Sequence, residues 1–384
     1  MSGPLAGLTV IELAGIGPAP FAGMVLADLG ADVIRVDRPG DSTYPGDARH
    51  DLHGRGKRSI AIDLKRPRGA HLVRALAAGA DVLIEGFRPG VAERLGVGPA
   101  DCHAANPRLV YGRMTGWGQD GPLAQTAGHD ITYLALTGAL HAIGPAGGPP
   151  VPPLNLVGDF GGGGMLLVAG VLAALWSAGR TGAGQVVDAA IVDGAALLAT
   201  QLYGLFHSGL WRDERGVNLL DGGAPFYGVY ETADGAYLAV GALEPEFYAE
   251  FASRLGLDPE RTPGQYDTAD WPRLRQAIAA RLATRTRDEW LAVFGGDSCV
   301  APVLSLREAS GHDGPGQRHL AERDTFVQAH GVRQPAPAPR FDATPAGPPR
   351  LPPPLPGEHS REILAQLSVA DADALLVEGV VTQR

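Results

Sequence analysis

The sequence contains few cysteines, few lysines and no excess of positive charge. Its two cysteines, Cys102 and Cys299, are too few for a disulfide framework or a zinc site built from cysteine, so we expect a reducing, cytoplasmic environment. The 384 residues carry 32 basic and 42 acidic side chains, a net charge of −10. Such a chain has no overall attraction to nucleic acid or to anionic membranes, and neither is expected as a partner.

Export signals and membrane spans are not expected either. The N-terminus lacks a basic segment followed by an apolar one. The longest apolar run, residues 165–176, is shorter than the roughly 20 residues of a spanning helix, and we interpret it as a buried helix. With 45% hydrophobic and 19% charged residues, the composition is typical of a globular protein of two or three domains.

Strand-length apolar runs alternate with helical stretches in the first half of the chain. Strands are expected at 8–14, 31–39, 59–64, 81–87 and 108–116, and helices at 21–30, 68–80 and near 90–95. This alternation predicts a large α/β domain with a doubly wound parallel sheet over residues 1–185. Residues 184–206 begin as a strand and become a long buried helix, which belongs to a linker over 186–224.

The periodicity changes near residue 224. Residues 224–243 alternate around a turn at 233–235 and predict a β-hairpin, and helices at 245–256 and 271–294 and a strand at 299–306 follow. We therefore predict a smaller α+β domain over 225–325. The return segment 326–384 contains a proline-rich stretch, 333–357, which favours an extended strap over a helix or a central strand, and a last helix at 361–367.

Two groups of residues in the first domain are candidates for binding phosphate. Residues 15–23 lie where a Rossmann fold has its phosphate loop, but Pro20 replaces the third glycine and removes an N–H donor. Arg38 follows the second strand, where it would meet a nucleotide phosphate, as in an NADP oxidoreductase, or remain a surface arginine. A second basic group indicates either a solvated face or a polyphosphate site; it consists of Arg55, Lys57, Arg58 and Lys65.

Three titratable residues stand near predicted element ends. His129 lies on a loop that enters a helix, as a catalytic base or a structural histidine, and Asp130 beside it is an equal candidate for the titrating group. Asp159 precedes four glycines and an apolar helix, as a reactive carboxylate or a helix cap. Glu244 ends a strand and by itself passes for a strand-end carboxylate or a helix cap.

Longer motifs run in order over almost the whole chain, among them ADLGADVIRVDRPG, DLKRPRG, DVLIEGFRPGVAERLG, RMTGWGQDGP, GHDITYLALTGAL, PPLNLVGDFGGG, GQVVDAAIVDG, CVAPVL and LPGEHSREIL. Together they resemble the alpha-methylacyl-CoA racemase branch of the family III CoA-transferases (CaiB/BaiF). The resemblance implies an α/β fold with a Rossmann-like large domain completed by residues 330–384, a smaller α+β domain and an interlocked homodimer. It also implies a site shared between subunits, with coenzyme A as part of the thioester substrate and no separate cofactor or metal.

The resemblance also implies roles for individual residues. His129 and Asp159 match the two acid/base groups, Glu244 from the partner subunit matches the residue that pairs with the histidine, and Asn155 matches a supporting polar neighbour. The matched contacts to coenzyme A are Arg38, Ile62, Asp63, Leu64, Lys65, Gly86, Phe87, Arg88 and Arg94. The matched lining of the thioester is Gly128, Asp130, Ile131, Thr132 and Tyr133, and further apolar walls are expected from Ile16, Leu123 and Leu154.

Two reactions fit these expectations. The first is racemisation of 2-methylacyl-CoA, in which an α-proton is removed and returned through an enolate whose oxygen is stabilised by N–H groups near Asp130 or Gly161–Gly164. The second is CoA transfer between carboxylic acids through an aspartyl intermediate at Asp159. The transferases generally lack the histidine and carry a longer glycine loop than residues 221–225, which favours the racemase. A non-catalytic acyl-CoA binding protein is a third hypothesis.

Overall fold

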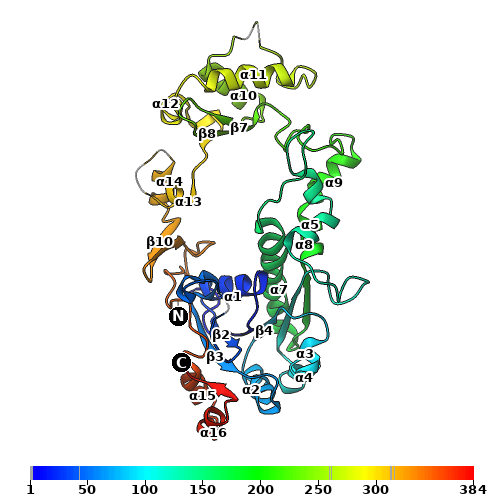
Figure 1. Ribbon diagram of the computed structural model, residues 1–384, viewed down its shortest axis with the longest axis vertical. Helices are drawn as coiled ribbons and strands as arrows, with labels where there is room; N and C mark the ends of the chain where they lie inside the picture. The colour runs from blue at the N-terminus through cyan, green and yellow to red at the C-terminus, as the bar shows by residue number, and fades with distance from the viewer. Residues whose placement is uncertain (1–2, 43, 259, 261, 312–313, 315) are drawn as a thin grey trace. The chain divides into compact units, whose positions relative to one another are not determined.

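The computed structural model describes residues 3–42, 44–258, 260, 262–311, 314 and 316–384 (Figure 1). The chain divides into two compact units. The large unit comprises the described residues up to Thr137, together with Leu154–Ala199 and Val327–Arg384, and the small unit comprises Gly138–Pro153 and Thr200–Phe326. These bounds differ from the predicted division at 138–153, which joins the small unit, and at 186–199, which stays in the large one.

A seven-stranded sheet, counted over the described residues, forms the centre of the large unit. Its strand order is β12-β3-β2-β1-β4-β5-β6, and every pairing is parallel except that of β12 with β3. The strands are β1 Thr9–Leu13, β2 Asp32–Asp37, β3 Lys57–Ile62, β4 Val82–Glu85, β5 Val110–Thr115, β6 Val186–Ala190 and β12 Val381–Thr382. The order from β3 to β6 is that of a Rossmann fold, which confirms the predicted doubly wound parallel sheet.

Helices cover both faces of this sheet because alternate residues of each strand point to opposite sides. Val10 and Val33 pack toward helices α1 Pro18–Asp28 and α7 Leu166–Thr181, whereas Ile11 and Ile34 pack toward the other face. The other described helices of this unit are α2 Pro67–Ala78, α3 Val91–Arg94, α4 Pro99–Ala105, α5 Asp130–Leu136, α8 Ile191–Leu198, α15 Ser360–Gln366 and α16 Ala372–Val377, with short 3-10 turns η1 Ala48–His50 and η2 Leu52–Gly54.

One helix of the large unit is longer than expected. A π-helical segment, η3 Leu156–Met165, continues directly into α7, so the apolar helix extends over Leu156–Thr181. This helix of 26 residues, whose most apolar 18-residue window has a mean hydropathy of 1.7, is long and apolar enough to cross a membrane by length and composition alone. Buried residues make up 39% of its most apolar window, and α7 packs against β5 and α1.

The predicted long buried helix within residues 184–206 is wrong. The chain there forms β6, which pairs with β5, and then the two short helices α8 and α9 Thr200–His207. No residue of α9 is buried. The apolar composition of this stretch resembled that of a core helix, but Leu197 and Leu198 at the end of α8 are 62% and 57% exposed.

The small unit confirms the predicted hairpin. Strands β7 Tyr227–Glu231 and β8 Tyr237–Gly241 pair antiparallel around the predicted turn, and β9 Val300–Pro302 adds a third strand. The predicted helix at 271–294 is two helices, because the chain turns at Ala283–Thr286 and Thr286 caps the second one. The helices are α6 Ala139–Ala142, α9, α10 Pro245–Leu255, α11 Trp271–Leu282, α12 Arg287–Val293, η4 Gly296–Ser298, α13 Leu306–Ala309 and α14 Gln317–Glu322.

The proline-rich segment crosses the large unit as an irregular strap, apart from β11 Val332–Pro335, which pairs with β10 Phe326–Ala329. Arginines from β2 and from the segment between β2 and β3 donate hydrogen bonds to carbonyl groups of the strap. Arg35 donates to the carbonyl of Pro354 at 3.0 Å, Arg49 to that of Pro353 at 2.8 Å, and Arg55 to that of Pro335 at 2.7 Å. Since prolines donate no N–H, these side-chain hydrogen bonds help to attach the strap to the large unit.

We predict that Arg55→Ala destabilises the fold. Arg55 also pairs with Asp28, and both side chains are only 5% exposed, so the variant leaves a buried carboxylate without its partner. Breaking such a pair costs about 3–5 kcal/mol, and the melting temperature should fall by several degrees. Arg340→Ala is the matched control, because Arg340 is exposed on the same strap and makes no ion pair with any described residue. Equal melting temperatures for the two variants would contradict the prediction.

Candidate active site

Asp159 lies in the first turn of a helix and not at its N-cap, which is Asn155. It is the fourth residue of η3, so the alternative that it caps the apolar helix is wrong. π-Helical segments are rare and occur often at functional sites. Burial raises the pKa of Asp159, and the nearby Asp130 carboxylate raises it further, whereas a hydrogen bond from the Asn155 side chain and the charge of His129 lower it. The net direction of the shift is upward, so Asp159 is a weaker acid than an ordinary aspartate.

The glycines after Asp159 allow η3 to pack unusually close to its neighbours. A Cβ atom on Gly162 would lie 2.7 Å from the Ala195 nitrogen of α8, and one on Gly164 would lie 2.6 Å from the Phe21 ring of α1. Gly162, Gly163 and Gly164 are buried within the helix. The expectation that Gly161–Gly164 form a turn whose N–H groups face a substrate is therefore wrong, because these residues pack between α1 and α8.

His129 stands at the N-cap position of α5. Its N–H donates to Thr132 Oγ1 at 2.9 Å and Thr132 Oγ1 donates to its carbonyl at 2.7 Å, which fixes the backbone and leaves the imidazole exposed. The next residue, Asp130, accepts a hydrogen bond from the Asp159 N–H at 2.6 Å. This bond joins the start of α5 to η3. It requires glycine at position 158, where a Cβ atom would overlap the Asp130 carboxylate.

The structure thus brings together four predicted residues of the large unit: His129, Asp130, Asn155 and Asp159. Because the Asp130 carboxylate accepts the hydrogen bond from the Asp159 N–H, we assign Asp130 a structural role. His129 remains as the exposed candidate base. Leu154 precedes Asn155 with a φ of 60°, a left-handed conformation that is uncommon for leucine. Such strain clusters at functional sites. Nothing in the sequence indicated this backbone, because leucine carries no turn signal.

Glu244 lies in the small unit, at the N-cap position of α10. Glu244 thus occupies the position of a helix cap, as one alternative predicted, but its side chain makes no capping hydrogen bond. Pro245 follows at the first helical position, which fixes where α10 begins.

The turn between β1 and α1 does not offer a dinucleotide phosphate site. Gly17 has a φ of 72° and is the N-cap residue of α1, but Pro18 and Pro20 supply no N–H, and the Phe21 N–H donates to the Gly17 carbonyl. A Cβ atom on Gly17 would also lie 3.5 Å from Asp159 Oδ2. A helix start with few free donors and a carboxylate beside it disfavours a diphosphate, and this argues against the NADP oxidoreductase.

The basic residues separate into two classes. Lys57 is fully buried, Arg55 is 4% exposed, and Arg58 binds Asp32 and Glu362. Of the two alternatives for this basic group, the polyphosphate site is wrong for these three residues, because each is held by carboxylates of the fold. In contrast, the side chains that follow β2, β3 and β4 at the carboxyl edge of the sheet are exposed and make no ion pair with any described residue; these are Arg38, Lys65, Arg88 and Arg94.

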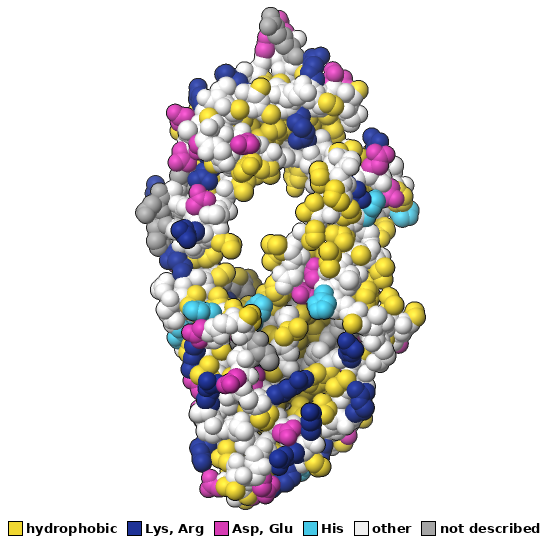
Figure 2. All heavy atoms as spheres, viewed as in Figure 1, with side chains coloured by type: hydrophobic (Ala, Val, Ile, Leu, Met, Phe, Trp, Pro, Cys, Tyr) yellow, Lys and Arg dark blue, Asp and Glu magenta, His cyan; other side chains and the backbone are white. Residues whose placement is uncertain are grey.

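The remaining predicted residues surround the same edge of the sheet. Asp63, Leu64 and Phe87 are half-buried and Gly86 is exposed, whereas Ile62 is buried in the core, so that only its main chain can reach a ligand. Near α5, Gly128 is half-buried, Ile131 and Thr132 are exposed, and Tyr133 is buried with its ring edge on Trp117. The expected apolar walls are exposed: Ile16 by 80%, Leu154 by 71% and Leu123 by 37%. Apolar side chains gather over α5 and α8 (Figure 2).

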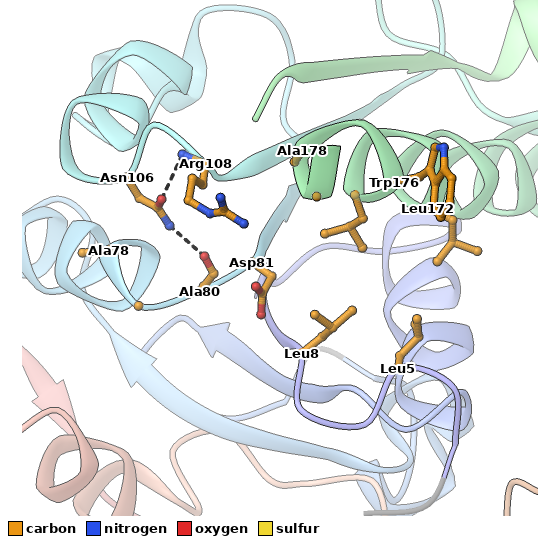
Figure 3. Close-up of a pocket in the computed structure, with 13 residues that line it drawn as sticks. Leu5, Leu8, Ala78, Ala80, Asp81, Asn106, Arg108, Leu172, Trp176 and Ala178 are labelled. Carbon is orange, nitrogen blue, oxygen red and sulfur yellow. Dashed lines mark hydrogen bonds between the residues drawn. The ribbon is translucent and has the colours of Figure 1, made fainter. Parts of the chain in front are cut away.

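A separate pocket of roughly 600 Å³ lies at the opposite, amino edge of the sheet (Figure 3). Its apolar lining includes Leu5, Leu8, Leu172 and Trp176, and its polar lining includes Asp81 and Arg108. It contains none of the predicted site residues, and ligands of open α/β sheets bind at the carboxyl edge. No group of three or more His, Cys, Asp or Glu side chains among the described residues could hold a metal ion.

Comparisons with known proteins show which protein family the chain belongs to. The model of CoA-transferase family III matches residues 5–360, so the chain belongs to this family. The alpha-methylacyl-CoA racemases of mouse and human are 46% and 47% identical, over 97% and 94% of this chain and 95% and 93% of their own length. The crystal structure of a CaiB/BaiF family protein from Brucella suis superposes with a TM-score of 0.80 at 27% identity, covering 96% of this chain and all of that one.

We predict that Asn155→Ala moves the acid limb of activity to higher pH. The Asn155 hydrogen bond stabilises the ionised form of Asp159, so its loss should raise the pKa of Asp159 further. If Asp159 is a group that abstracts the α-proton, it must be ionised to do so, and the rate should then begin to fall at a higher pH than in the unaltered enzyme. The measurement is the pH profile of α-proton exchange. Asn155→Asp, which adds a like charge, should move the limb in the same direction, and an unchanged limb in both variants would refute the assignment.

Proposed function

We propose that this protein is a racemase that interconverts (R)- and (S)-2-methylacyl-CoA thioesters by removing the α-proton from one face and returning one to the other. The observation that carries the proposal is the pairing of an exposed histidine with a half-buried aspartate of raised pKa, joined through the Asp130 bond to the Asp159 N–H. The near-full-length similarity to alpha-methylacyl-CoA racemases supports it.

His129 and Asp159 act as the two acid/base groups. In each direction one accepts the α-proton while the other donates, so each must exist in both protonation states near neutral pH. Histidine is the side chain that most often fills such a role, and burial together with the neighbouring Asp130 raises the pKa of Asp159. The enolate oxygen meets the N–H of Asp130 at the start of α5, which has no acceptor among the described residues; such a donor contributes about 3–4 kcal/mol in comparable sites.

The coenzyme A moiety binds along the carboxyl edge of the sheet. Arg38 and its unpaired neighbours Lys65, Arg88 and Arg94 supply the positive charge that the phosphates need on an otherwise acidic protein. Because the α-proton is acidified by the thioester itself, the reaction needs no separate cofactor. We place the enzyme in the cytoplasm, consistent with its two free cysteines.

The active enzyme is an interlocked homodimer in which the partner's Glu244 pairs with His129. Two features support this arrangement. Glu244 belongs to the small unit and lacks a capping bond, and the chain exposes large apolar side chains that a partner would cover. These are Leu197, Leu198, Tyr203, Phe206 and Leu210, exposed by 48–72%.

CoA transfer through an Asp159 adduct is the second candidate. Membership of the family and the position of Asp159 favour it, but it assigns no role to His129. Transfer of CoA to an added free acid without loss of the α-proton would establish it.

We predict that His129→Ala and Asp159→Ala separate the two directions of proton exchange. In heavy water, His129→Ala should lose exchange from one enantiomer of 2-methylacyl-CoA, and Asp159→Ala should lose exchange from the other. Proton NMR of the α-proton measures both, and neither variant should racemise. Unaltered exchange from both enantiomers in either variant would refute the two-base assignment.

We predict that Arg38→Ala raises KM more than it lowers kcat. A contact to a phosphate remote from the reacting carbon binds the ground state and the transition state equally. Steady-state kinetics with the acyl-CoA substrate test this. Arg318→Ala, an exposed arginine of the small unit, should change neither constant. A loss confined to kcat would argue against the phosphate role.

A further inference from the structure

Lys57 is a buried cation that the proposed chemistry does not use. Its side chain on β3 has no exposed area, although lysine is almost never fully buried. The ammonium group donates to Glu12 Oε2 on β1 at 2.6 Å and to the Pro20 carbonyl at 2.8 Å. The second bond is the notable one, because Pro20 belongs to the first turn of α1.

The first turn of α1 is fitted to this pair. Gly23, one turn below Pro20, lies directly over the Glu12 carboxylate, and a Cβ atom there would overlap Oε2. The other carboxylate oxygen, Oε1, is buried without a partner. The Lys57 ammonium therefore holds the carboxylate and the helix together at one fixed height above the sheet.

The same turn of α1 contacts the helix that carries Asp159. The Phe21 ring stacks on the Phe160 ring with centroids 4.9 Å apart, and the Gly17 Cβ position lies 3.5 Å from Asp159 Oδ2. His129 depends on a different support, the reciprocal hydrogen bonds with Thr132 at the start of α5. A displacement of the first turn of α1 would therefore change the position of Asp159 more than that of His129.

We propose that Lys57 is a positioning residue for Asp159: by bonding the Pro20 carbonyl, it fixes the start of α1 against which the Asp159 carboxylate and Phe160 are placed. The inference rests on the proposed two-base function. Lys57 contacts no substrate, and its effect should appear in only one of the two half-reactions.

The test uses the full-length enzyme with Lys57→Met and Glu12→Leu combined, because the double change leaves no unpaired buried charge and such replacements are commonly tolerated. In heavy water, α-proton exchange from the enantiomer that depends on Asp159 should fall by about ten- to a hundredfold, the usual effect of a misplaced catalytic group. Exchange from the other enantiomer should stay within about twofold. KM should be unchanged for both.

Two further variants sharpen the result. Arg55→Met with Asp28→Leu removes another buried pair of the same unit, at the far end of α1, and should leave the ratio of the two exchange rates unaltered. Glu12→Gln keeps the donor to the Pro20 carbonyl and should also preserve the ratio, even if the double variant does not fold. A changed ratio in Glu12→Gln, or equal losses from both enantiomers in the double variant, would overturn the positioning role.

Failure of the proposed function is recognised separately. His129→Ala and Asp159→Ala first assign one enantiomer to each group. If those variants do not separate the enantiomers, the two-base function fails. If they do, while the Lys57→Met/Glu12→Leu variant leaves the ratio unchanged, only the inference about Lys57 fails.

Discussion

The close packing of η3 between α1 and α8 is the constraint on which the candidate site depends. Gly162 and Gly164 bring the helix so near its neighbours that a single methyl group would clash on either side. Asp159 lies one turn before this contact, and the contact determines the surroundings of Asp159. Gly17 lies on one side of it and Asp130 on the other. The raised pKa of Asp159 thus originates in backbone packing, which partly buries its carboxylate and places a second one beside it.

The basic side chains also divide into those that stabilise the fold and those that are available to bind a ligand. The basic side chains inside the fold are matched by carboxylates, as Lys57 is by Glu12, Arg55 by Asp28 and Arg113 by Glu85. Those at the carboxyl edge of the sheet are unmatched among the described residues. An unpaired arginine on the surface of an acidic protein has free donors in a location where a phosphate would find few competitors. The basic side chains without a carboxylate partner, and not the net charge of the chain, therefore indicate where a phosphate would bind.

The sequence predicted the parallel sheet and the small-unit hairpin because strand patterns and turn residues are local signals. It predicted His129, Asp159 and Asn155 through longer motifs that no single residue type carries. It did not predict that Lys57 and Arg55 are buried, since a basic run looks the same whether its partners lie beside it or come from Glu12, Asp28 and the distant strap. It also misjudged the glycine run, whose purpose depends on α8, a neighbour that follows some 30 residues later in the chain.

The choice between the two reactions depends on what a carboxyl group must do. A nucleophilic aspartate works best when ionised, and an arginine or several N–H donors would keep its pKa low. Around Asp159 the structure provides the opposite, burial and a second carboxylate, moderated by one amide and one imidazole. This environment suits a group that gains and loses a proton in every turnover. His129, exposed and rigidly capped on α5, then supplies the complementary group that the transferase mechanism leaves without a role.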